Sequence, residues 1–214
     1  MKINKKAWGE VYKEKGRFFE KPHRDLPKIA KILKKANARK VLDLGCGTGR
    51  HLVYLAKQGL DVYGTDISGV AIKMSKEWLK NEKLAATLKI HDMTEKLPFK
   101  DNFFDGIVAI QVIHHANIET IQKIISEIYR VLNKGGLVFV TVPAYNGPIT
   151  GVRKGSWTMK KIASRTYIPL DGIEKGLPHY FFRQKELVRE FKKFKIEKTY
   201  FDNTNHFCLL GFKK

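Results

Sequence analysis

The chain has 214 residues, 43% of them hydrophobic and 29% charged, a composition typical of one soluble domain with a sizeable core. Its two cysteines, Cys46 and Cys208, are too few for a disulfide framework or a four-ligand metal cluster, and no metal site is predicted. No apolar run approaches the roughly 18 residues that span a bilayer, and no signal peptide is apparent. We therefore expect a cytoplasmic protein with no membrane partner.

The net charge of +20 is unevenly distributed along the chain. Residues 1–40 contain 14 basic and 4 acidic side chains, residues 41–143 contain 12 and 11, and residues 144–214 contain 15 and 6. The two flanks therefore carry +10 and +9, whereas the middle carries +1. Such flanks indicate either an anionic partner, for example a nucleic acid, or a solvated basic surface.

The first forty residues combine aromatic side chains with a helical pattern. Apolar residues recur at helical spacing from Leu26 to Leu33, which predicts an amphipathic helix that covers one side of a sheet. Four aromatic residues precede it: Trp8, Tyr12, Phe18 and Phe19. They are candidates for part of a lid over the substrate.

The stretch from Val41 to Arg50 is the centre of the predicted site. Its first four residues have the composition of a short buried strand, and a helix is expected from His51, after three glycines at alternate positions. This strand, turn and helix would leave backbone N–H groups open to a ligand. The pattern Asp-x-Gly-x-Gly-x-Gly resembles motif I of the class I S-adenosylmethionine-dependent methyltransferases. It comprises Asp43, Gly45, Cys46, Gly47 and Gly49.

Two further acidic residues follow the next predicted strands. Asp66, with Ile67 after it, ends the second strand 21 residues beyond Gly45, where an open α/β sheet places a carboxylate for ribose hydroxyl groups. Asp92 and Met93 follow the third strand. The resemblance implies that their counterparts bind the adenine of S-adenosylmethionine.

The rest of the core continues the resemblance. Residues 106–110 form an apolar run typical of a central parallel strand, and the resemblance implies that the carbonyl of Gln111 after it meets the amino group of the cofactor. A helix capped by Asn117 is expected to end at Gly135-Gly136, before a fifth strand at residues 137–143. Asp43, Gly45 and Gly47 would then line the methionine end of the cofactor.

The resemblance implies an α/β, Rossmann-like fold with a seven-stranded sheet in the order 3-2-1-4-5-7-6, an antiparallel last strand, and helices on both faces. We expect a single domain over residues 1–214. Residues 1–40 would form a basic and aromatic cap with a helix, and residues 41–143 the cofactor-binding core. Residues 144–180 would be an insertion over the active site, and residues 181–214 a helix with the final strand pair.

His114 and His115 follow the fourth strand and are the candidate catalytic residues. A general base is needed only where the acceptor must lose a proton, so structural roles for both are the alternative. Because adjacent residues on a tight turn point in different directions, we expect at most one of them to face the substrate. The chain lacks the Asn/Asp-Pro-Pro-Tyr segment that relatives use on exocyclic base amines, and it lacks a Pro-Cys nucleophile.

Three functions remain open. Methyl transfer to a small molecule is favoured by the missing nucleic-acid motifs, and methyl transfer to structured RNA is favoured by the basic flanks. The third is a non-catalytic S-adenosylmethionine-binding protein with the same fold. Within the RNA class, the chain is similar to the tRNA wobble-uridine carboxymethyl methyltransferases at Val112-Ile113-His114-His115, at residues 177–182 and at Asp202-Asn203.

Overall fold

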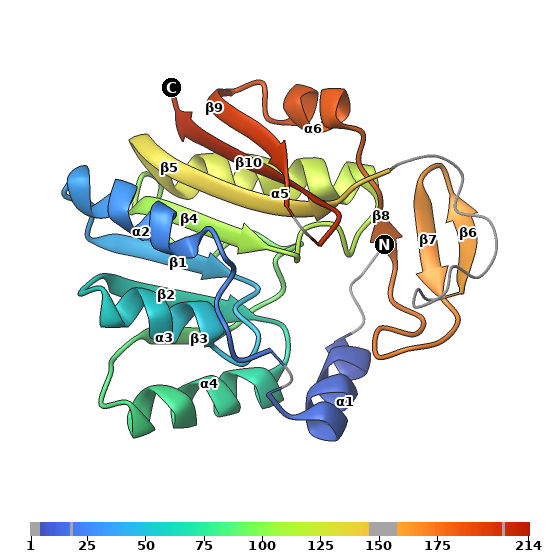
Figure 1. The fold of residues 1–214 in the computed structure, drawn as a ribbon, viewed down its shortest axis with the longest axis horizontal. Helices are drawn as coiled ribbons and strands as arrows, with labels where there is room; N and C mark the ends of the chain where they lie inside the picture. Colours follow the sequence, from blue (N-terminus) through green and yellow to red (C-terminus); the bar gives the residue numbers. More distant parts are fainter. Residues whose placement is uncertain (1–4, 18, 146–157, 203) are drawn as a thin grey trace.

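A seven-stranded sheet runs through the molecule, with helices on both of its faces (Figure 1). This computed structural model describes residues 5–17, 19–145, 158–202 and 204–214. The strands of the large sheet are β1 (Lys40–Leu44), β2 (Asp61–Asp66), β3 (Thr87–Ile90), β4 (Phe104–Ile110), β5 (Leu132–Pro143), β9 (Phe194–Phe201) and β10 (His206–Lys213). They lie in the order β3-β2-β1-β4-β5-β10-β9. Because β10 is antiparallel to both β5 and β9, the predicted topology is confirmed.

Six helices are described: α1 (Lys5–Lys15), α2 (Leu26–Lys35), α3 (Arg50–Lys57), α4 (Gly69–Asn81), α5 (Ile118–Val131) and α6 (Gln184–Glu190). Side chains alternate between the two faces of a strand, and β1 therefore contributes to two cores. Val41 packs into the core formed with α2 and α3, whereas Leu42 and Leu44 pack into the core formed with α5 and α6. None of the described helices is long and apolar enough to cross a membrane.

The polar residues that begin two of these helices act as caps. The side chain of Ser68 accepts a hydrogen bond from the N–H of Ala71 at 3.3 Å at the start of α4. The side chain of Asn117 accepts from the N–H of Thr120 at 3.1 Å at the start of α5. Each cap satisfies a helix N–H that has no partner within its own helix. The caps fix where the chain turns away from β2 and β4.

The predicted end of α5 is wrong. The helix ends at Val131 and β5 begins at Leu132, so the two glycines lie inside the strand. Asp105 explains the early extension, because its carboxylate accepts from the side chain of Asn133 at 2.7 Å and from the N–H of Lys40 at 2.9 Å. These bonds hold residue 133 beside β1 and β4.

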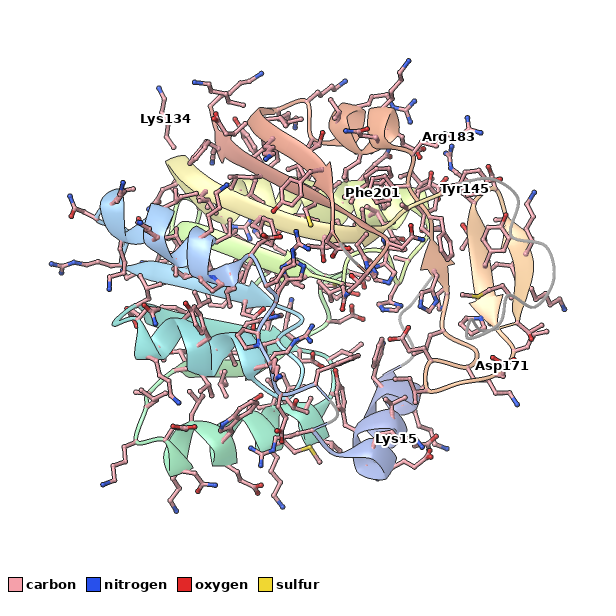
Figure 2. All side chains as sticks on the ribbon, in the orientation of Figure 1. Lys15, Lys134, Tyr145, Asp171, Arg183 and Phe201 are labelled. Atoms are coloured by element: carbon pink, nitrogen blue, oxygen red, sulfur yellow. The ribbon has the colours of Figure 1, made fainter. Side chains whose placement is uncertain are left out.

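A second, three-stranded sheet lies beyond the carboxyl ends of the large one (Figure 1). It consists of β6 (Met159–Ala163), β7 (Thr166–Pro169) and β8 (His179–Tyr180), and the sequence did not predict it. Residues 146–157 of the predicted insertion lie outside the described residues. Tyr145 and Arg183 lie together where the chain enters and leaves this region, with the guanidinium carbon 5.5 Å from the ring centre (Figure 2). The proposed division of the chain into segments stays a prediction.

The strands direct their last residues to one edge. The arrowheads of β1, β2 and β4 point towards the side on which α1 and β8 lie (Figure 1). Open α/β sheets bind ligands at this carboxyl edge, beside the switch in strand order. Here the switch lies between β1 and β4.

Candidate cofactor and acceptor site

Two cavities share part of their wall at the carboxyl edge of the sheet. The larger has a volume of about 370 Å³ and the smaller about 60 Å³. Both are lined by Trp8, Tyr12, Gly45 and Gln111. Helix α1 therefore closes over the point where the cavities meet. The N-terminal aromatic residues do line the site as expected, with Phe19 at the larger cavity; Phe18 lies outside the described residues.

Glycine is required in the loop after β1 because other elements approach it closely. A Cβ atom on Gly45 would lie 2.1 Å from a methyl carbon of Val112, and one on Gly47 would lie 3.0 Å from the hydroxyl oxygen of Tyr12. Both glycines have positive φ angles, 69° and 54°. The loop therefore lets α1 and the loop after β4 come against the backbone.

The predicted open N–H groups of this loop are largely absent. The N–H groups of Gly45 and Cys46 donate to the carbonyl of Thr65 at 2.8 and 2.9 Å, and that of Gly47 donates to Asp66 at 2.9 Å. The prediction was wrong for these three groups because β2 runs beside the loop and supplies acceptors. The glycines instead allow α1 and the loop after β4 to approach the backbone of this loop closely.

Asp66 lies between the glycine loop and the smaller cavity. One of its oxygens accepts from Gly47 and the other from the N–H of Ser68 at 2.8 Å. Burial raises the pKa of this carboxyl to about 6, with the two N–H bonds opposing the shift and the charge of Asp43 adding to it. Ile67 and Met93 line the same cavity. Asp66, Ile67 and Met93 are therefore suited to bind the adenosine part of the cofactor.

Asp43 is buried with no hydrogen-bond partner for either carboxylate oxygen in the described part of the chain. Only 1% of the residue is exposed, and the nearest ion-pair contact is His51 Nδ1 at 3.8 Å. An uncompensated buried carboxylate is costly, and a bound cation would offset that cost. Gly45 and His51 line the larger cavity beside it. S-adenosylmethionine carries an ammonium and a sulfonium group, so this position fits its methionine end.

Three other predicted residues occupy different positions around the cavities. Asp92 accepts two hydrogen bonds from Thr94, at 2.9 and 2.8 Å, and does not line either cavity. Gln111 lines both cavities and has φ at +58°, a strained value for a non-glycine residue. Cys46 lines the larger cavity, and burial raises the pKa of its thiol well above the usual value. The cofactor contacts of Asp92 and Gln111 stay predictions.

His114 and His115 lie in contact with a third histidine. The ring centres of His114 and His115 are 4.1 Å apart, and that of His179 lies 5.3 and 4.6 Å from them. His114 lines the larger cavity and His115 the smaller. The two neighbours therefore face different cavities. Burial lowers the pKa of His115 to about 3, with His179 adding to the effect, and burial also lowers the pKa of His114 well below its usual value.

Glu174 completes this group and was not predicted. Its carboxylate lies 2.6 Å from Nε2 of His179, whose Nδ1 lies 2.9 Å from the carbonyl of Leu177. Burial acts to raise the pKa of Glu174, but the bond to His179 and the nearby histidines outweigh it, and the pKa is lowered. No motif marks Glu174, because it lies in a loop whose position depends on the tertiary fold. Sequence reasoning also missed several other lining residues, among them Arg50, His51, His91, Met159, Thr204 and Asn205.

The core of the chain has known relatives. Residues 42–140 match a family model described as "Methyltransferase domain". The uncharacterized methyltransferase sll0829 of Synechocystis is 35% identical over 99 residues, which are 46% of this chain and 44% of that protein. The tRNA (carboxymethyluridine(34)-5-O)-methyltransferase of Arabidopsis thaliana is 33% identical over 122 residues, which are 54% of this chain and 27% of that protein. The chain thus spans less than half the length of these relatives.

The whole fold also has solved counterparts. The crystal structure of the PH0226 protein from Pyrococcus horikoshii has a TM-score of 0.74 at 20% identity, covering 96% of this chain and 99% of that one. At this identity the likeness concerns the fold. It extends over the flanks as well as over the region that carries the motifs.

Proposed function

We propose that this chain, which carries a class I S-adenosylmethionine-dependent methyltransferase domain as its motifs predicted, is an enzyme that transfers a methyl group from S-adenosylmethionine to a small organic acceptor. The domain assignment and its cofactor are confirmed by the match over residues 42–140. The observation that best supports the activity is the pair of adjoining cavities, with Asp66 at one and the loop beside Asp43 at the other. With the smaller cavity opened by a movement of α1, the pair would accommodate a cofactor and an acceptor end to end.

Different residues would bind the two ends of the cofactor. Asp66, Ile67 and Met93 would hold the adenosine, and the charge of Asp43 would offset the positive methionine end. S-adenosylmethionine supplies a methyl group on a sulfonium, already activated for displacement by a lone pair on the acceptor. The protein then has mainly to hold the two reactants in line and to exclude water.

The lining of the larger cavity supports a small acceptor. Trp8, Phe19, Met159 and Phe181 give it an apolar wall, while the Glu174–His179 pair supplies polar groups that can orient the acceptor. A mainly apolar pocket with a few placed polar groups is typical of small-molecule sites. Because burial keeps His114 and His115 uncharged at neutral pH, neither would repel the sulfonium.

RNA is the second candidate acceptor. The +10 and +9 charges of the two flanks and the similarity to the Arabidopsis tRNA enzyme favour it. A cavity of about 370 Å³ would admit only an extruded base or its substituent. The two acceptor classes therefore differ in whether the protein surface around the cavity also binds phosphates.

Two measurements test the proposal. Calorimetry should detect binding of both S-adenosylmethionine and S-adenosylhomocysteine, and the absence of either interaction at about 1 mM would contradict it. Incubation with methyl-labelled cofactor and a fractionated cell extract should then label the small-molecule fraction. Label in tRNA alone would favour the second candidate. Binding without label in any fraction would indicate a non-catalytic cofactor-binding protein.

A further inference from the structure

Three histidines from two separate segments meet beside the larger cavity. His114 and His115 follow β4 and His179 begins β8, yet one potential ligand nitrogen from each lies within 4.8 Å of the other two. All three are buried, with 4%, 3% and 5% of their surface exposed. The N–H of Tyr180 donates to the carbonyl of His114 at 2.8 Å and fixes β8 against the loop. The backbone therefore holds the three rings together.

Packing alone does not explain three imidazoles at this position. Burying a ring nitrogen costs free energy unless it is hydrogen-bonded, so phenyl rings would fill the space at lower cost. The buried Nδ1 atom of His114 has no hydrogen-bond partner in the part of the chain that the structure describes. An imidazole nitrogen without a hydrogen-bond partner is a potential metal ligand.

The outer contacts of the other two rings are those of metal-binding histidines. Nδ1 of His115 lies 3.2 Å from the carbonyl oxygen of Pro178, and Nδ1 of His179 lies 2.9 Å from that of Leu177. Metal ligands usually donate their second ring N–H to a backbone carbonyl or a carboxylate, which fixes the tautomer and the orientation of the ring. Both rings are oriented in this way.

His179 makes one more contact than a neutral ring can satisfy. Its two nitrogens face a carbonyl and the Glu174 carboxylate, both of which are acceptors. A neutral imidazole has only one N–H, so it cannot donate to both acceptors at once. A cation bound between Nε2 of His179 and the carboxylate would satisfy both groups.

We propose that His114, His115 and His179 form a binding site for a divalent transition metal ion of the zinc type, supported by the carboxylate of Glu174. Three imidazoles are one of the ligand sets of catalytic zinc sites, and because such sites can expand to five ligands, the carboxylate and one further atom could both bind. Bonds of about 2.1 Å in a tetrahedron place the ligand atoms about 3.4 Å apart, so the nitrogens would have to approach one another by about 1.4 Å at most from the present limit of 4.8 Å. Side-chain rotation can supply this movement.

The ion would face the acceptor. His114, His179 and Glu174 all line the larger cavity, so an open coordination position there could hold an oxygen or nitrogen atom of the acceptor. This role rests on the proposed function, whereas metal binding itself does not. The metal site would then orient the acceptor, which the apolar wall of the larger cavity cannot do alone.

The binding test uses protein without a histidine tag, first dialysed against a chelator. Calorimetry with Zn²⁺ and visible absorption with Co²⁺ should each give one ion per chain, with a dissociation constant in the micromolar range or below. His115→Ala and His179→Ala should each weaken binding by at least about 100-fold, and Glu174→Gln by about 10–100-fold. No saturable binding of either ion at about 1 mM, or unchanged binding in both alanine variants, would overturn the proposal.

A second group of potential ligands provides the control. His23, Asp25 and Cys208 also lie within 4.8 Å of one another. His23→Ala should leave binding unchanged, and the Co²⁺ spectrum should lack thiolate charge-transfer bands. The opposite result in either measurement would place the ion at this second group and refute the histidine site.

Folding and cofactor binding are followed separately in every variant. Circular dichroism should show the native fold, and an alanine variant that does not fold would be replaced by the corresponding glutamine variant. Binding of S-adenosylhomocysteine by the chelated wild type tests the proposed function independently. If the wild type binds the metal ion but not S-adenosylhomocysteine, only the methyltransferase proposal is contradicted. If it binds S-adenosylhomocysteine but not the metal ion, only the metal site is contradicted.

Discussion

The carboxylate of Asp66 accepts a hydrogen bond from the N–H of Gly47 at 2.9 Å, which joins the end of β2 to the glycine loop after β1. Its second oxygen accepts from the N–H of Ser68 at 2.8 Å. Each carboxylate oxygen has two acceptor positions, so Asp66 can hold the loop and still accept from ribose hydroxyl groups. One side chain thus has both a structural role and a proposed binding role.

Replacing Asp66 with Ala should weaken the binding of S-adenosylhomocysteine by at least about tenfold. Hydrogen bonds to a charged acceptor are each worth about 1.5–3 kcal/mol, and the variant loses two of them. Calorimetry measures the affinity, and circular dichroism checks the fold. Asp61→Ala is the matched control, because Asp61 is exposed at the start of the same strand. Equal affinity in wild type and Asp66→Ala would show that the ribose is held elsewhere.

The raised pKa of Asp66 predicts opposite pH effects on binding and on stability. Below its pKa of about 6 the carboxylate is protonated, so the dissociation constant for S-adenosylhomocysteine should rise by about tenfold per pH unit as the pH falls. The folded state binds this proton more tightly than the unfolded chain, whose carboxyl titrates near 3.8. Protonation therefore stabilises the fold as the pH falls from about 6 to about 4, by up to about 3 kcal/mol.

Asp66→Asn isolates this effect, because the variant has no carboxyl group at the position. The wild type should gain unfolding free energy relative to Asp66→Asn as the pH falls through this window, as measured by urea unfolding at several pH values. A constant difference between the two proteins would show that the pKa of Asp66 is not raised.

Gly45→Ala should destabilise the protein more than Gly59→Ala. Both glycines have positive φ, 69° and 79°, so both substitutions introduce backbone strain of about 1–3 kcal/mol. Only at Gly45 would the new Cβ overlap a neighbour, at 2.1 Å from Val112, whereas nothing lies within 4 Å at Gly59. We expect an additional loss of about 1–3 kcal/mol at Gly45, measured by urea unfolding. Gly45→Ala with Val112→Ala should recover part of it, and equal losses at the two glycines would contradict the overlap.

Helix α1 should move when the cofactor binds. The smaller cavity, about 60 Å³, is far below the roughly 300 Å³ of a small-ligand pocket, and Trp8 and Tyr12 of α1 line it. The ring of Trp8 lies 4.9 Å from that of His115, so opening this cavity should change its surroundings. We expect S-adenosylhomocysteine to alter tryptophan fluorescence in the wild type and not in Trp8→Phe. An identical change in both proteins would assign the signal to another tryptophan.

The sequence predicted the parts of the site that belong to a continuous motif. Asp66 and Gly45 take their positions from a strand and from the turn that follows a strand, and such local patterns fix their place in a sheet of known order. The same reasoning placed His114 at the end of β4. The strand order itself came from the resemblance to the class I methyltransferases, and the structure confirms it.

The remaining parts of the site depend on contacts between distant segments. Glu174 and His179 are only five residues apart, but they meet His114 and His115 only because β8 returns beside the loop after β4, where the N–H of Tyr180 donates to the carbonyl of His114 at 2.8 Å. No spacing in the sequence encodes that return. Likewise, only the tertiary structure shows that the buried carboxylate of Asp43 has no hydrogen-bond partner among the described residues. The early end of α5 follows from the distant Asp105, which outweighs the local preference of two glycines for a helix end.

Two basic residues of the flank formed by residues 144–214 are exposed beside the larger cavity. Lys160 and Lys161 lie exposed on β6, next to Met159, which lines the cavity. Arg165 is unsuited to this role, because its guanidinium binds Glu186 and the hydroxyl of Tyr180. Arg153 and Lys154, two further basic residues of this flank, lie outside the described residues. The two lysines are therefore the informative pair for the second candidate function.

If RNA is the acceptor, Lys160→Ala with Lys161→Ala should weaken tRNA binding and lower the slope of log affinity against log salt by about one to two units, because each phosphate contact releases a counterion. Lys34→Ala with Lys35→Ala is the matched control. These lysines are exposed at the end of α2, five or six residues before β1, and thus at the opposite edge of the sheet. Filter binding at several salt concentrations gives both slopes. Equal slopes in the two double variants would indicate that tRNA binds only through non-specific attraction to the net charge. That result would support the small-molecule acceptor.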